Sequence, residues 1–205
     1  MSGNPGRVVA VCAGRCAPLA MPDGGGRAAV VSAIAKSAIG SPDAPLAVQV
    51  GPLGLAGDEQ ADPSVHGGQS QAVYVYPHEH YAFWRTVRMQ AQRDEPLAAG
   101  AMGENLLVEG LLEPSIWVGD RLLVGEVELR VESPRAPCFK FDARMGFAWA
   151  ARMMIQSGYT GFYCSVVRQG KLAAGDSVLV RPGERVVSIE QAHRIRHRSR
   201  QSRPF

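Results

Sequence analysis

The chain has 205 residues, of which 46% are hydrophobic and 20% charged, a composition that suits one globular domain with a sizeable core. No apolar run approaches the roughly 20 residues that span a bilayer. Four scattered cysteines make no disulfide framework and no signal-peptide pattern opens the chain, so we expect a cytoplasmic protein that does not enter a membrane.

Short apolar runs separated by glycine and proline predict a series of strands. In chain order these strands are residues 8–13, 46–50, 71–76, 105–108, 121–124, 127–131, 162–168 and 177–181. Gly125 and Glu126 would join two of them in a hairpin, although this turn pair is unusual. Few helices separate the strands, which favours a closed or nearly closed barrel over a parallel sheet. We therefore expect a mainly β fold with a few peripheral helices.

Two similar segments, Gly119-Asp120 and Gly175-Asp176, each precede a predicted strand. A glycine followed by an aspartate is typical of a turn in which the carboxylate binds the backbone of its own loop. We interpret both segments as corners of the barrel.

Three short helices are predicted. The first starts at Pro77, the second covers residues 147–157 and ends at Gly158, and the third begins at Ser188, which forms a capping box with Gln191. This third helix would lie outside the barrel. We divide the chain into a barrel domain at 1–183, with its core motifs at about 30–181, and a short helix with a basic tail at 184–205.

The net charge of +3 is concentrated in that tail. From residue 181 to 205 there are seven arginines and two glutamates, a surplus of five, so the first 180 residues carry a net charge of −2. Such a tail can contact nucleic acid or an acidic partner. No aromatic residues alternate with the arginines as stacking platforms, so we do not expect nucleic-acid binding and interpret the tail as a solvated terminus.

Cys138 lies between Pro137 and Phe139, close to Arg135 and Lys140. Prolines on both sides of Ala136 disfavour regular structure, and cationic neighbours favour the thiolate, the form that attacks electrophiles or binds soft metals. A buried, unreactive cysteine is the alternative.

The second polar segment spans residues 54–68. It contains Asp58 and His66 among many glycines, with little bulky apolar content, and its last two residues are Gly67 and Gly68. Backbone amides of such glycines can approach an anion closely, but the Lys-Ser or Lys-Thr ending of a nucleotide-binding P-loop is missing. A loop of turns with satisfied carboxylates is the alternative.

A third polar pair, Glu104 and Asn105, follows Gly103 at the start of a predicted strand. Its side chains either point into a pocket at the barrel rim or close a local turn. The spacing of Cys12 and Cys16, without a nearby histidine, favours a strand cysteine and a loop cysteine over a metal clip.

Taken in order, the segments at 54–62, 65–68, 103–106, 134–138 and 158–163 resemble the MOSC family, the molybdenum cofactor sulfurase C-terminal domain, in its YiiM-type bacterial branch. The resemblance runs from about residue 8 to 181. It implies a β-barrel that binds molybdenum on a pterin dithiolene, with Cys138 as the protein ligand to the metal. It further implies reduction of N-hydroxylated compounds, such as purines, with electrons from a separate flavin- or iron–sulfur-containing reductase.

The resemblance also assigns the remaining site residues. Arg135, together with Lys36, suits the phosphate of the pterin, because a guanidinium offers two parallel hydrogen bonds. Asp58 and His66 could bind the pterin edge or protonate the departing oxygen. The predicted cofactor-binding set is Lys36, Asp58, His66, Gly67, Gly68, Glu104, Asn105, Arg135 and Cys138.

Two departures from the family stand out. Gln71 occupies a position that is often basic in relatives, and the three-helix appendage common in the YiiM-type branch is reduced to one short helix. The alternatives to a reductase are a module that carries the cofactor or transfers sulfur without turnover, and a cofactor-free hydrolase that uses Cys138 with His66.

Overall fold

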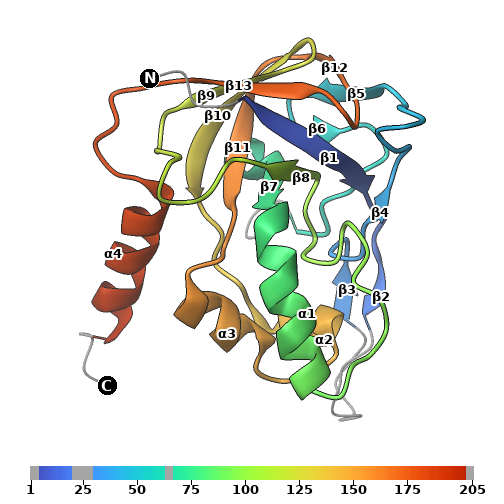
Figure 1. The fold of residues 1–205 in the computed structure, drawn as a ribbon, viewed down its shortest axis with the longest axis vertical. Helices are drawn as coiled ribbons and strands as arrows, with labels where there is room; N and C mark the ends of the chain where they lie inside the picture. Colours follow the sequence, from blue (N-terminus) through green and yellow to red (C-terminus); the bar gives the residue numbers. More distant parts are fainter. Residues whose placement is uncertain (1–4, 20–29, 63–66, 202–205) are drawn as a thin grey trace.

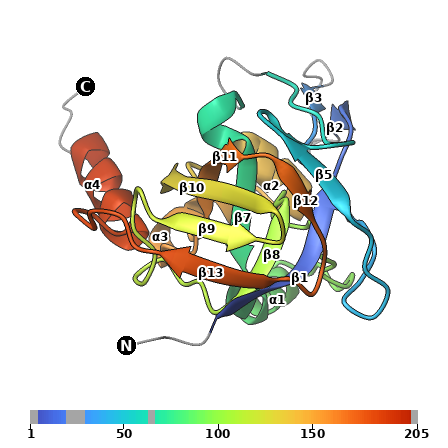
Figure 2. The same cartoon turned by 90° about the horizontal axis from the view of Figure 1, so that it is seen from above.

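The computed structural model describes residues 5–19, 30–62 and 67–201, and its main feature is a closed β-barrel (Figure 1 and Figure 2). Seven strands pair in the order β13-β9-β10-β11-β7-β8-β1, and pairing of β1 with β13 closes the barrel. Only β7 and β8, among these described strands, run parallel. The barrel strands are β1 (Gly6–Ala13), β7 (Val73–Pro77), β8 (Leu106–Glu109), β9 (Arg121–Val124), β10 (Val127–Pro134), β11 (Phe162–Arg168) and β13 (Ser177–Arg181). The expected mainly β fold is confirmed.

Shorter strands decorate this barrel. They are β2 (Ala17–Leu19) paired with β3 (Val30–Ser32), β4 (Ser37–Ala38) on the edge of β1, and the sheet of β12 (Gly170–Leu172), β5 (Val48–Gly51) and β6 (Gly54–Leu55). The helices are η1 (Gln69–Gln71), η2 (His78–His80), α1 (Tyr81–Gln90), α2 (Phe139–Met145), α3 (Ala150–Ser157) and α4 (Ile189–Gln201). No helix in the described part of the chain is long and apolar enough to cross a membrane.

Two hydrophobic clusters follow from the alternation of side chains along the strands. On β7, Val73 and Val75 belong to the cluster that fills the barrel, whereas Tyr74 and Tyr76 belong to a second cluster shared with α1, α2 and α3. This explains why all five residues of β7 are buried. The three helices lie together below the barrel, and α4 stands beside it (Figure 1). The helices therefore cover one end of the barrel.

The predicted corners are confirmed. Gly125 turns the hairpin between β9 and β10 with a φ of 54°, and a Cβ added there would lie 2.6 Å from the carbonyl oxygen of Lys171. Asp120 accepts a hydrogen bond from the amide of Trp117 at 3.2 Å, and Asp176 accepts one from that of Ala173 at 2.8 Å. Both aspartates therefore bind their own loops.

The helix predictions need two corrections. Pro77 is the last residue of β7 and the N-cap of η2, so the helical segment begins at His78, one residue later than predicted. The fixed φ and missing N–H of proline suit both a strand end and a helix start. The second helix begins at Ala150, not at residue 147. The prediction of an irregular stretch before Cys138 is confirmed: β10 ends at Pro134, α2 begins at Phe139, and residues 135–138 between them form neither helix nor strand.

The third helix agrees with its prediction. The hydroxyl of Ser188 accepts the amide of Gln191 at 3.2 Å, and the side-chain oxygen of Gln191 accepts the amide of Ser188 at 3.0 Å. This reciprocal pair is the expected capping box. The boundary that we draw at residue 183 between barrel and appendage stays a prediction.

Candidate functional site

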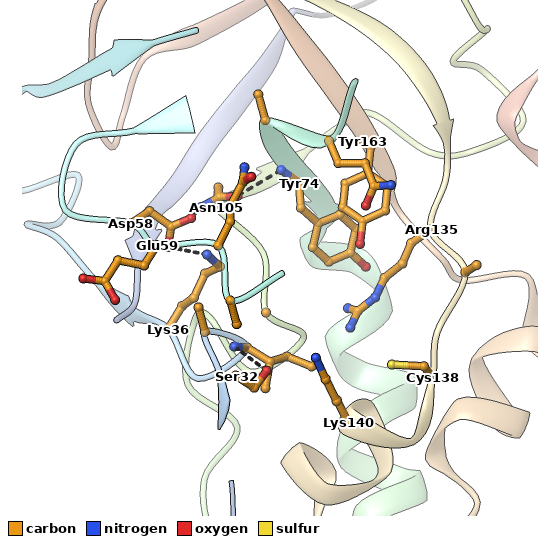
Figure 3. A pocket seen from close by; sticks show the side chains of 18 residues that line it. Ser32, Lys36, Asp58, Glu59, Tyr74, Asn105, Arg135, Cys138, Lys140 and Tyr163 are labelled. Carbon is orange, nitrogen blue, oxygen red and sulfur yellow. Dashed lines mark hydrogen bonds and ion pairs between the residues drawn. The ribbon is translucent and has the colours of Figure 1, made fainter. Parts of the chain in front are cut away.

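A pocket opens at the helix-covered end of the barrel, and we call it the Cys138 pocket (Figure 3). Its walls come from the β3–β4 loop, the loop after β6, β7, the segment before β8, the β10–α2 connection and β11. The lining residues on which the argument depends are Lys36, Asp58, Glu59, Tyr74, Asn105, Arg135, Cys138, Lys140 and Tyr163. Segments distant in sequence thus meet in one site.

Asp58 organises one side of the pocket. Its Oδ1 accepts the amide of Gly14 at 2.8 Å and the ammonium of Lys36, and its Oδ2 accepts the side-chain amide of Asn105 at 2.8 Å. The side chains of Lys36 and Asp58 are only 8% and 9% exposed. Asn105 in turn accepts the amide of Tyr74 at 3.0 Å. If either partner of a buried ion pair moves away, the other charge is left buried without compensation, which costs free energy. The network therefore holds Lys36 in place.

Arg135 crosses the opposite wall. Its guanidinium carbon lies 4.8 Å from the ring centre of Tyr74 and 4.9 Å from that of Phe141, and Nη1 donates to the carbonyl of Met102. Arg135 is buried. Cation–π contacts on two rings hold the planar group in one orientation, which suits it to present its remaining N–H groups to a ligand.

Cys138 and Lys140 face Arg135. Figure 3 shows the sulfur of Cys138 and the ammonium of Lys140 pointing into the pocket from the start of α2. Cys138 is half-buried and forms no disulfide. A thiol and two cations, Arg135 and Lys140, therefore share one space, and the two cations suit this space to an anionic ligand.

Two tyrosines line this pocket that the sequence analysis did not predict as site residues. Tyr74 on β7 donates its hydroxyl to the carbonyl of Thr160 at 2.7 Å, and its ring centre lies 5.1 Å from that of Tyr163 on β11. Burial raises the pKa of Tyr163, although nearby Arg135 opposes the shift. The available signal was the alternation within the two strands, which places both side chains on the outer, helix-facing side of the barrel.

Glu104 lies outside the lining of the Cys138 pocket. It is fully buried and accepts the hydroxyl of Tyr81 and the amides of Gly100 and Met102, at 2.7 and 3.0 Å for the two amides. Burial raises its pKa, while these donors oppose the shift. Glu104 thus fixes the turn whose Met102 carbonyl holds Arg135.

The glycine-rich loop is only partly described. His66 lies outside the described residues. Gly67 and Gly68 do not line the pocket, and the amide of Gly68 donates to the side chain of Gln60 at 2.8 Å. Gln71, where relatives are often basic, does line it. Of the predicted set, Lys36, Asp58, Asn105, Arg135 and Cys138 come together.

The other cysteines occupy the expected places. Cys12 is buried in β1, where burial raises its pKa, and Cys16 lies in the following loop. Within 5–19, 30–62 and 67–201, no group of three or more histidine, cysteine, aspartate or glutamate residues is arranged to hold a metal ion.

Comparison with known proteins places these features in a family. The family model described as MOSC domain matches residues 62–179. One bacterial relative is "Uncharacterized protein YflK" from Bacillus subtilis, which is 39% identical over 69% of this chain and 62% of its own length. Another is "Protein YiiM" from Escherichia coli, which is 40% identical over 60% of this chain and 54% of its own length. The chain thus matches less than two thirds of the length of either. A protein named "Reductase" from Gibberella moniliformis is 34% identical over 70% of this chain and 26% of its own.

Solved structures agree with the fold. The crystal structure of YiiM from Geobacillus stearothermophilus has a TM-score of 0.72 at 25% identity, covering 97% of this chain and 87% of the other. The crystal structure of YiiM from Escherichia coli has a TM-score of 0.67 at 26% identity, and the match covers 98% of this chain and 78% of the other. The barrel and its helices are therefore shared with both.

Proposed function

Because this chain belongs to the MOSC domain family, we propose that it is a cytoplasmic oxidoreductase that binds the molybdenum cofactor and reduces N-hydroxylated compounds. The observation that carries the proposal is the convergence of Cys138, Arg135 and Lys140 on one pocket. The relative named as a reductase supports the reaction class.

The residues of the Cys138 pocket fit such a group. Cys138 offers the thiolate that a soft, redox-active metal prefers. Arg135 and Lys140 offer charge to the phosphate, and Lys36, which Asp58 holds on the opposite side of the pocket, adds a third positive charge. Once bound, the cofactor would supply two electrons at one centre.

The protein itself must supply the protons and hold the side chains of the pocket in position. Reduction of R–NH–OH to R–NH₂ and water takes up two electrons and two protons, and the electrons would come from a separate flavin- or iron–sulfur-containing reductase. The Oη of Tyr163 holds a proton at neutral pH, as an ordinary phenol does, and burial raises its pKa further. Asp58, whose oxygens accept from Gly14, Lys36 and Asn105, serves in this proposal to orient Lys36 and Asn105.

Metal analysis tests the proposal first. The wild type and Cys138→Ser are purified from a host that makes the cofactor, with Cys16→Ser as the matched control, because Cys16 does not line the pocket. We expect about one molybdenum per chain in the wild type and in Cys16→Ser, and a large loss in Cys138→Ser. Equal molybdenum in all three would remove Cys138 as the ligand.

Turnover is the second measurement. The molybdenum-loaded wild type, given a chemical reductant, should convert an N-hydroxylated purine to the amine, and Cys138→Ser should not. Full molybdenum without any reduction would contradict the reductase and would favour the carrier module instead.

A further inference from the structure

A second cavity lies at the far end of α2 from Cys138, and we call it the Arg144 cavity. It has a volume of about 340 Å³ and opens between the C-terminal ends of α1 and α2 and the loop of residues 95–101. The seven residues of α2 separate it from the cysteine by roughly 10 Å along the helix axis. Three arginines line it: Arg88, Arg93 and Arg144.

Two of these arginines are held in place by the cavity walls. Arg88 donates from Nη1 to the carbonyl of Glu95 at 2.9 Å and from Nη2 to its carboxylate at 2.8 Å. The Nε of Arg93 donates to the carbonyl of Gly146 at 2.9 Å. Gly146 ends α2 with a φ of 83°, and a Cβ added there would lie 3.3 Å from that same Nε. The glycine thus lets Arg93 lie against the helix end.

Arg144 has no such partner. No hydrogen bond or ion pair joins it to the part of the chain that the structure describes, and its Nε is buried, as is that of Arg88. Glu95 is the one carboxylate among the described residues that line the cavity, which leaves a surplus of two positive charges. Buried N–H groups are ordinarily paired, whereas these two Nε atoms are buried without a partner in residues that are otherwise partly exposed. The cavity is therefore short of acceptor oxygens.

We propose that the Arg144 cavity binds a phosphate monoester. A phosphate dianion matches the charge surplus, and its oxygens can accept from guanidinium groups that approach from α1, from Arg93 in the turn after α1 and from α2. Pro96, Leu97 and Met145 add an apolar wall against which a small organic group can pack. The cavity is several times larger than a free phosphate ion needs. The proposal does not rest on the function of the Cys138 pocket.

The bound ester would order elements that reach the first pocket. The loop that forms one wall runs on into residues 102–105, where the carbonyl of Met102 holds Arg135 and Asn105 binds Asp58. Gly100 in that loop packs on Lys36, since an added Cβ would lie 2.5 Å from the carbonyl oxygen of that lysine. Occupancy should therefore stabilise the whole helix-covered end of the barrel.

Thermal unfolding in increasing sodium phosphate or glycerol 3-phosphate, at fixed ionic strength set with chloride, tests the site. At ten times the dissociation constant, the midpoint of the wild type should rise by about 3 °C. Arg144→Gln and Arg93→Gln should lose most of this shift. Arg152→Gln, the same charge change on the exposed face of α3, should retain it.

The variant Lys140→Gln distinguishes binding in the Arg144 cavity from binding in the Cys138 pocket, because Lys140 lines the Cys138 pocket and not the Arg144 cavity. The shift should persist in this variant, whether or not the protein binds molybdenum. No shift in the wild type, an equal shift in Arg144→Gln, or loss of the shift in Lys140→Gln alone would each overturn the site. Weaker binding of glycerol 3-phosphate than of inorganic phosphate would overturn the choice of an ester.

Discussion

Tyr163 and Cys138 face the same pocket but make opposite demands on protonation. In the proposed reaction, a cysteine that binds the metal would do so as a thiolate, whereas a proton donor would keep its hydrogen until the N–O bond breaks. Burial raises the pKa of Tyr163 above its ordinary value near 10, so the phenol stays protonated across the physiological range. We predict that Tyr163→Phe lowers kcat by about 100-fold or more while molybdenum content is unchanged.

The matched control for this substitution is Tyr159→Phe. Tyr159 stacks on His80 with ring centres 3.9 Å apart and does not line the Cys138 pocket, so its hydroxyl should be dispensable. If Tyr163→Phe retained full kcat, or if wild-type kcat fell with deprotonation of a group well below pH 10, another proton donor would have to be sought. Steady-state rates from pH 6 to 10 provide both answers.

Individual site residues differed in how far the sequence could place them. Cys138 and Arg135 were predictable because prolines and charges surround them within a few residues. Glu104 and Asn105 are adjacent, yet one binds the 100–102 turn and the other faces the pocket. Which of two neighbouring polar side chains faces a cavity depends on the path of the backbone, and no local pattern records that path.

At the scale of elements, α4 depends on its first turn. The helix is rich in arginine, so it buries little apolar surface against the rest of the protein. The capping box of Ser188 and Gln191 therefore contributes much of its local stability. We predict that Ser188→Ala destabilises α4 by about 1 kcal/mol. Hydrogen exchange should quicken in the amides of α4 and not in the barrel strands. Ser177→Ala, at an exposed position of β13, should leave α4 unchanged; equal exchange in both variants would contradict the role of the cap.

The elements that the sequence did not reveal are the shortest ones. Helix α2 has seven residues and starts after Cys138 without a side-chain cap, so neither periodicity nor a capping residue marks it. Strands β2, β3, β4, β6 and β12 have two or three residues each, too few for a readable alternation. By contrast, β9, β11 and β13 match their predicted bounds, because each is a run of strand formers bounded by turn residues.

At the scale of the molecule, the pattern of strands predicted the barrel, whereas only the family resemblance predicted which distant residues would share the pocket. Strand spacing indicates closure, but the strand order β4-β1-β8-β7-β11-β10 is what brings residue 36 and residue 138 to one pocket. A site assembled in this way depends on the whole fold. Conversely, a ligand that bridges its walls should stabilise the whole fold, since it binds the folded state alone.

The last prediction uses this linkage. Protein from a host that makes the cofactor should unfold at a temperature at least about 5 °C higher than protein from a host that cannot make it, because occupancy at 100 times the dissociation constant adds about 2.7 kcal/mol. Cys138→Ser should unfold at the same temperature from both hosts, if Cys138 is the metal ligand that we propose. Calorimetry of the four samples in phosphate-free buffer measures the effect without any assay of turnover. A difference that persists in Cys138→Ser would mean that the thiolate is not the link between cofactor and fold, and that Arg135 and Lys140 hold the ligand without it.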